Sequence, residues 1–158
     1  MAHPWLGVVA PPSSADWQRW AQWALPVAGV LAMYLPVYWW AAGGIWQSDD
    51  HAHGPLVLAV VILLFWALRR PLWELLPQSQ IWTGWPLFAV GLLAYVLGRA
   101  LEFTILQFAS QIPLLAGVLL LLRGAPALRL AWFPVLYLVF MIPLPGPLVD
   151  ALTGPLKQ

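Results

Sequence analysis

Cysteine is absent from this sequence, and charged side chains are scarce. None of the 158 residues is Cys, and only 8% are Asp, Glu, Lys or Arg. The lack of Cys excludes disulfides, thiolate metal sites and a cysteine nucleophile within these residues. Soluble domains carry about 25% charged residues, so a water-soluble fold of this size could not cover its surface. The net charge of +1 is too small to indicate nucleic acid, and we expect no nucleic-acid partner.

Apolar side chains dominate the composition. They make up 62% of the residues, and the 12 Trp and 16 Pro are far above ordinary usage. Trp favours the membrane interface, which accommodates both its apolar ring and its N–H group. The three His residues leave little for a metal site with several ligands, and no cofactor is expected. The composition therefore predicts an all-α integral membrane protein that crosses the lipid bilayer several times.

Hydropathy indicates a short tail over residues 1–20 followed by five helical spans. The tail has no apolar run after a basic start, so we do not expect a cleavable signal peptide. The expected spans cover residues 21–42, 54–68, 82–97, 103–122 and 130–144. The second is short for a bilayer core of roughly 30 Å, which needs about 20 residues. We expect residues 21–158 to form one multi-pass helical bundle.

The basic residues indicate how the chain lies in the membrane. With the N-terminus in the cytoplasm, only Arg99 and Lys157 of the seven Lys and Arg residues fall on the outer side. This distribution follows the positive-inside rule. The inner residues are Arg19, Arg69, Arg70, Arg123 and Arg129. We therefore expect most of the remaining polar groups on the outer side.

The first outer group is the segment Asp49–Pro55, with two carboxylates and two imidazoles. His51 and His53 are two apart, a spacing that suits a chelate in a loop or strand, and zinc or copper accepts such ligands. A second interpretation is a functional His53. The third is a wet loop that caps the second span. The residues alone leave all three open.

Two further groups lie on the expected outer side. Arg99 and Glu102 are three residues apart, so they could pair on one helical face, or Arg99 could face a pocket and bind an anionic group. Further on, Pro143, Pro145 and Pro147 end a helix and force an extended or turning backbone. At membrane depth such backbone must be buried in protein or line a wet cavity. The proline segment is therefore the strongest physical indication of a site.

Several stretches resemble the exosortase/archaeosortase family. Near the end of the chain these are Phe133-Pro134, Phe140–Pro145 and Leu152–Lys157. Upstream, His53–Val57 resembles the His-Gly element that opens a span in this family, and Trp66–Arg70 resembles its Trp-plus-basic ending. Single positions that also agree are Gly98, Arg99, Ser110, Gly117 and Gly124. Among subtypes, the resemblance is to the B-type exosortases of Gram-negative bacteria.

The resemblance implies a multi-pass enzyme of the bacterial inner membrane with a cysteine nucleophile at its outer face. In such a cysteine-type peptidase and transpeptidase a thiolate attacks the peptide carbonyl, and cationic donors hold the oxyanion. The implied partners are exported proteins that carry a C-terminal Pro-Glu-Pro sorting signal. The possible substrate-side or structural residues of this chain are Asp50, His53, Arg99, Pro143, Pro145, Thr153 and Pro155.

The sequence departs from the family in one decisive respect. The family's nucleophile belongs to an Ala-Cys-Ser-Gly element that follows the Leu-Thr-x-Pro-Leu motif, and these residues include no Cys. We therefore carry over no catalytic residue, and expect the N-terminal part of an exosortase, truncated and inactive by itself. Ser110 and Thr153 are conceivable hydroxyl nucleophiles, but neither has an obvious general base. A small transporter or channel subunit and a non-catalytic membrane scaffold stay open as alternatives.

Overall fold

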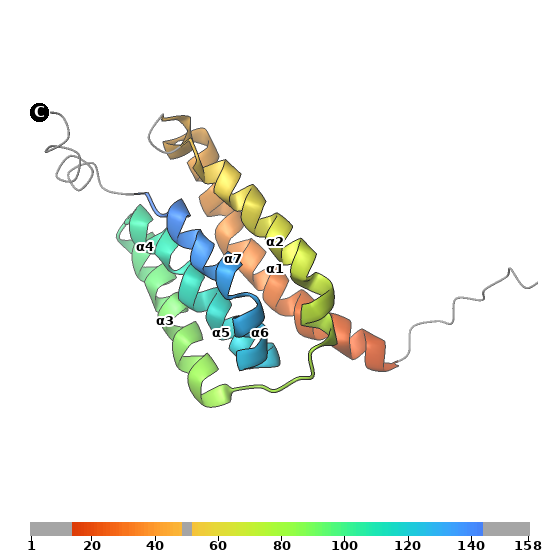
Figure 1. Cartoon of the computed structure of the whole chain (residues 1–158). Helices are drawn as coiled ribbons and strands as arrows, with labels where there is room; N and C mark the ends of the chain where they lie inside the picture. Colours follow the sequence, from red (N-terminus) through yellow and green to blue (C-terminus); the bar gives the residue numbers. More distant parts are fainter. Residues whose placement is uncertain (1–13, 49–51, 144–158) are drawn as a thin grey trace, which may run out of the picture.

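The computed structural model describes residues 14–48 and 52–143, and no strand occurs among them. In chain order the elements are α1 (Ser14–Gly43), η1 (Ile45–Gln47), α2 (Gly54–Glu74), α3 (Ile81–Ala100), α4 (Thr104–Ala109), α5 (Gln111–Arg123), α6 (Ala125–Leu130), α7 (Trp132–Tyr137) and η2 (Leu138–Met141). Figure 1 shows these helices packed side by side in a bundle. The expected all-α, multi-pass architecture is confirmed.

The chain runs up and down, so the helix ends gather at two ends of the bundle (Figure 1). The end of α1, the start of α2, the end of α3, α4 and η2 form one end, which we call the His53 end. The end of α2, the start of α3, the end of α5 and α6 form the other, which we call the Arg123 end. Arg69, Arg70, Arg123 and Arg129 lie toward the Arg123 end, and Arg99 lies at the His53 end. The expected separation of these basic residues is therefore present.

Four helical segments are long and apolar enough to cross a bilayer. They are Ala21–Gln47, Gly54–Glu74, Ile81–Ala100 and Thr104–Arg123. A helix of about 20 residues spans the roughly 30 Å of a hydrocarbon core. In the described part of the chain, the expected fifth span is a shorter apolar helix, Trp132–Met141. The expected end of the second span at Leu68 is wrong, because α2 continues through the basic pair to Glu74.

Two prolines explain why the later helices are divided into short pieces. A proline has no N–H for the carbonyl four residues before it, and its ring crowds that carbonyl. α4 ends at Ala109, four residues before Pro113, and α6 ends at Leu130, four residues before Pro134. In both places the helical hydrogen bonds resume one residue later. The segment Thr104–Arg123 is therefore one kinked span.

A neighbouring helix supports the backbone of α1 where Pro36 disturbs it. The ring of Pro36 crowds the preceding helical turn and weakens the hydrogen bonds to its carbonyls. One of these carbonyls, that of Met33, accepts a hydrogen bond from the Tyr95 hydroxyl of α3 at 2.7 Å. Donors from adjacent helices commonly satisfy such carbonyls in membrane proteins. Tyr95 therefore ties α3 to the disturbed turn of α1.

Glycines let α3 approach the α4–α5 segment closely. They repeat every seven residues along α3 and are all buried: Gly84, Gly91 and Gly98. A Cβ atom at Gly91 would lie 2.5 Å from the Leu114 backbone nitrogen, and one at Gly117 of α5 would lie 2.5 Å from that of Phe88. Small residues permit this kind of backbone approach between membrane helices. The family-like Gly98 and Gly117 thus have a packing role.

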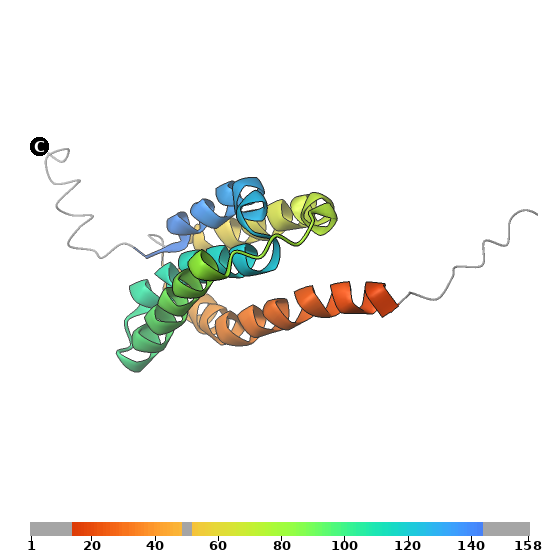
Figure 2. The same ribbon diagram turned by 90° about the horizontal axis from the view of Figure 1, so that it is seen from below.

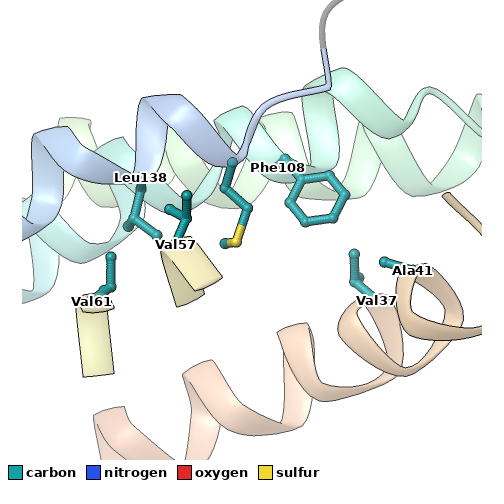
Figure 3. Close-up of a cluster of buried hydrophobic side chains, with 7 residues drawn as sticks. Val37, Ala41, Val57, Val61, Phe108 and Leu138 are labelled. Atoms are coloured by element: carbon teal, nitrogen blue, oxygen red, sulfur yellow. The ribbon is translucent and has the colours of Figure 1, made fainter. Parts of the chain in front are cut away.

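The α4–α5 segment lies at the centre of the bundle. In Figure 2, α1 lies on one side of it, and α2 with α7 lies on the other. Of its most apolar window, 44% is buried, against 17% in each of the other three long segments. Buried side chains from all these layers meet toward the His53 end (Figure 3): Val37, Ala41, Val57, Val61, Phe108, Leu138 and Met141.

The orientation of the bundle is testable because the chain has no native Cys. Ser48, near the His53 end, and Gln78, in the loop at the Arg123 end, are both exposed. If the basic Arg123 end faces the cytoplasm, a membrane-impermeant thiol reagent should label Ser48→Cys but not Gln78→Cys in cells with a permeabilised outer membrane. Both variants should react after complete lysis. The reverse pattern in unlysed cells would invert the orientation.

Candidate functional site at the His53 end

His53 stands at the start of α2 and joins it to the segment after α7. Its carbonyl oxygen accepts the first helical hydrogen bond, from the Val57 N–H at 3.0 Å. Its ring makes no capping bond, and Nε2 instead lies 3.1 Å from the Phe140 carbonyl oxygen. Because a carbonyl only accepts, Nε2 carries the proton in this contact. The contact joins the His-Gly element to the Phe140–Pro145 element, whose linked residues are 87 positions apart.

The two residues after His53 also have physical reasons for their identity. Gly54 is buried beneath the indole of Trp46, where a Cβ atom would collide with the ring. Trp46 in turn stacks on Tyr38, with 6.1 Å between ring centroids. Pro55 lies in the first turn of α2, where a missing N–H costs nothing. The sequence His-Gly-Pro therefore starts a helix, admits an indole and places an imidazole beside η2.

The helix before the proline cluster ends as the sequence predicts. η2 ends at Met141, and Ile142 is extended, with φ −72° and ψ 118°, the conformation favoured before a proline such as Pro143. Pro143 itself is half-buried. Other predicted site residues lie outside the described residues, so their roles stay predictions: Asp50, Pro145, Thr153 and Pro155.

Arg99 occupies a different part of the His53 end. It lies in the last turn of α3 and borders a hollow of about 410 Å³. The hollow is lined by two residues of α1 and four from α3 to α4: Val37, Trp40, Arg99, Glu102, Thr104 and Gln107. Arg99 and Glu102 are both exposed, and the described part of the structure has no ion pair between them. The predicted pairing on one helical face is therefore not formed.

The turn after α3 explains why Glu102 does not continue that helical face. The N–H of Phe103 donates to the Gly98 carbonyl at 2.8 Å, and the N–H of Glu102 donates to the Arg99 carbonyl at 3.4 Å. These two bonds form the Schellman pattern of helix ends, which places Glu102 in the left-handed region, with φ 54°. Glycine is the usual residue there, and a residue with a Cβ costs about 1–2 kcal/mol. Glu102 is therefore held beside the hollow at a conformational cost.

Buried and half-buried polar side chains link α1 to the α4–α5 segment between these two regions. The Tyr34 hydroxyl lies 2.7 Å from Ser110 Oγ, and the Tyr38 hydroxyl donates to Gln111 Oε1 at 2.6 Å. Ser110 Oγ also donates to the Gln107 carbonyl at 2.6 Å. Sequence reasoning missed the two tyrosines. Two signals were available. The tyrosines are four residues apart and so lie on one helical face, and the fourth span contains the polar pair Ser110-Gln111.

The environment of Ser110 does not suit a nucleophile. Its side chain is 0% exposed, and its partners are a phenol and a backbone carbonyl. Because Ser110 donates to the carbonyl, the phenol donates to Ser110 and is not placed to take its proton, and a backbone carbonyl is not basic enough to do so. Ser110 lies at the kink between α4 and α5, where its hydroxyl connects the kink to α1.

Metal ligands and the second hollow add little to the site. Among residues 14–48 and 52–143, no cluster of three His, Cys, Asp or Glu side chains could hold a metal ion. His51 lies outside these ranges, so a zinc or copper chelate with His53 stays a prediction. A hollow of about 610 Å³ at the Arg123 end is lined by residues 79–83, none of which is charged.

Comparison with known families decides the affiliation. The profile of the transmembrane exosortases matches residues 39–158, which is more than half of the chain. This chain belongs to the transmembrane exosortase family. No curated protein and no solved structure matched it. The matched part of this exosortase contains the contact between His53 and Phe140, and also Arg99 and Glu102.

Proposed function

We propose that this exosortase takes part in cutting the Pro-Glu-Pro sorting signals of exported proteins at the outer face of a bacterial inner membrane. In this reaction a thiolate attacks the peptide carbonyl, and the resulting acyl group passes to an acceptor. The observation that carries the proposal is the family match over residues 39–158. The resemblance to B-type exosortases supports the choice of signal.

The described residues contribute structure and substrate positioning in this proposal, and not the nucleophile. The sequence contains no Cys, so the thiol has to come from protein outside these residues. His53 has the clearest positioning role, because its ring holds the Phe140 carbonyl just before the proline segment. By fixing that backbone, His53 would shape the wall along which an extended peptide lies.

The proposal is tested by comparing the chain alone with a fusion that supplies a cysteine nucleophile. The 158-residue chain is produced in a host without its own exosortase, together with an exported protein that carries a Pro-Glu-Pro signal. We expect no cleavage, because no thiol is present to ionise. Appending the C-terminal half of a close relative, with its Ala-Cys-Ser-Gly element, should produce cleavage. Cleavage by the chain alone would contradict the proposal, as would an inactive fusion that accumulates normally.

Variants of His53 sharpen the same assay. In the active fusion, His53→Ala should lower the cleavage rate about tenfold or more at unchanged protein level, since small misplacements of a site cost rate factors of up to about 100. His53→Gln retains an N–H donor for the Phe140 carbonyl and should recover part of the rate. Normal cleavage by His53→Ala would mean that His53 serves only to start α2 and does not position the substrate.

A further inference from the structure

Two opposite charges border the hollow beside α3 without neutralising one another. Arg99 and Glu102 both line it and are exposed, and no ion pair joins them in the described part of the structure. Glu102 is also in a left-handed conformation, φ 54°, that glycine would adopt without strain. A carboxylate is thus held at a conformational cost beside a guanidinium that it does not contact. This arrangement suits a ligand that carries both charges.

The hollow lies where the bundle meets the membrane surface. Arg99 is in the last turn of the span Ile81–Ala100. Trp40, which forms part of the wall, is 57% exposed, and the adjacent Trp39 is 83% exposed. Exposed Trp side chains near the ends of spans mark the level of the lipid headgroups. The hollow is therefore next to headgroups on one side and to the apolar chains on the other.

From these observations we propose that the hollow binds the headgroup of a zwitterionic phospholipid, phosphatidylethanolamine. The phosphate accepts hydrogen bonds from the Arg99 guanidinium, and the ammonium donates to the Glu102 carboxylate. Gln107 already uses its amide N–H on the Gly98 carbonyl, at 2.9 Å, so its carbonyl oxygen can accept from the same ammonium. Trp40, which is exposed, offers apolar contact to the glycerol and the first methylenes. The site is independent of the proposed cleavage reaction.

A ligand of single charge fits the hollow less well. A lone anion, such as an acidic peptide side chain, would gain Arg99 but would meet the negative charge of Glu102. A lone cation would meet the opposite repulsion from Arg99. Only the dipolar headgroup has an attractive partner for each of the two side chains. This difference sets the direction of the effect expected from neutralising Glu102.

Lipid retention by the purified 158-residue chain tests the proposal. The chain in detergent is given equal amounts of phosphatidylethanolamine and phosphatidylglycerol with identical acyl chains, and the bound lipids are counted by native mass spectrometry. Wild type should retain phosphatidylethanolamine preferentially. Arg99→Gln should lower that retention about fivefold, as expected for one charge contact in a wet site. Glu102→Gln removes the carboxylate that binds the ammonium. Because only phosphatidylethanolamine carries an ammonium, this variant should lose the preference.

Matched variants separate binding from folding. Arg70→Gln and Glu74→Gln remove the same charges from exposed positions on α2 and should keep the preference. Glu102→Gly should lose the preference although it relieves the left-handed strain, and it should not unfold at a lower temperature. Equal retention of the two lipids by wild type would overturn the proposal. So would a Glu102→Gln variant that keeps the wild-type preference for phosphatidylethanolamine, because its carboxylate would then have no part in selecting the headgroup.

Discussion

Replacing Gly91 by alanine is expected to destabilise the bundle by about 1–3 kcal/mol, the usual cost of overpacking a filled interior. The new Cβ atom would lie 2.5 Å from the backbone nitrogen and 2.7 Å from the Cα of Leu114. Backbone atoms cannot turn aside as the end of a long side chain can. The helices α3 and α5 would therefore have to move apart and lose contact along the interface. Alanine's better helix propensity, about 1 kcal/mol, offsets only part of this cost.

Gly29 supplies the matched control for this prediction. It lies inside the same kind of membrane helix, α1, but a Cβ atom there would meet nothing within 4 Å. Gly29→Ala should be neutral or slightly stabilising, since only the helix propensity changes. Gly117→Ala should resemble Gly91→Ala, because its Cβ would meet the Phe88 backbone. Thermal unfolding in one detergent compares all three, and equal melting temperatures for Gly29→Ala and Gly91→Ala would refute the close approach of α3 and α5.

The sequence was sufficient for the class of fold and the approximate number of long helices. Long apolar runs and sparse charge have few solutions in a bilayer other than helices. Helix ends were harder to predict. The basic pair Arg69-Arg70 was interpreted as the end of a span, but α2 continues past Pro71 to Glu74, since a basic pair at an interface does not interrupt helical hydrogen bonds. The interruptions before Pro113 and Pro134 were not predicted.

The sequence offered candidate site residues, whose roles stay predictions, but not their arrangement. His53 and the proline segment were both identified, yet nothing local indicates that His53 reaches the Phe140 carbonyl, 87 positions away. The spacing of Arg99 and Glu102 left two interpretations open, a pair on one helical face or an Arg99 that faces a pocket, and the pair is not formed. A pair on one face needs a helix that continues through both residues, whereas the Schellman turn ends α3 before Glu102 and places Glu102 in the left-handed region. Tertiary contacts and helix ends therefore had to come from the structure.

The hydrogen bond between Tyr34 and Ser110 should carry the second large effect on stability. Ser110 gives its only hydroxyl proton to the Gln107 carbonyl at 2.6 Å, so in the 2.7 Å contact the Tyr34 hydroxyl is the donor. Both side chains are buried, with 2% and 0% of their surface exposed. Ser110→Ala leaves the phenol without its acceptor, which costs about 1–3 kcal/mol in a buried site. Tyr34→Phe leaves the serine bonded to Gln107 and should cost less.

A double-mutant cycle measures this bond directly. If the pair interacts as described, the double variant Tyr34→Phe/Ser110→Ala should be more stable than the sum of the single effects predicts, by about 1 kcal/mol. The phenylalanine has no donor left to satisfy, so losing Ser110 then costs mainly its bond to Gln107. Tyr137→Phe, at a half-buried tyrosine of α7, controls for the loss of a phenol elsewhere and should be nearly neutral. Strictly additive effects in detergent unfolding would mean that α1 is held against the kink of α4 and α5 by apolar packing alone.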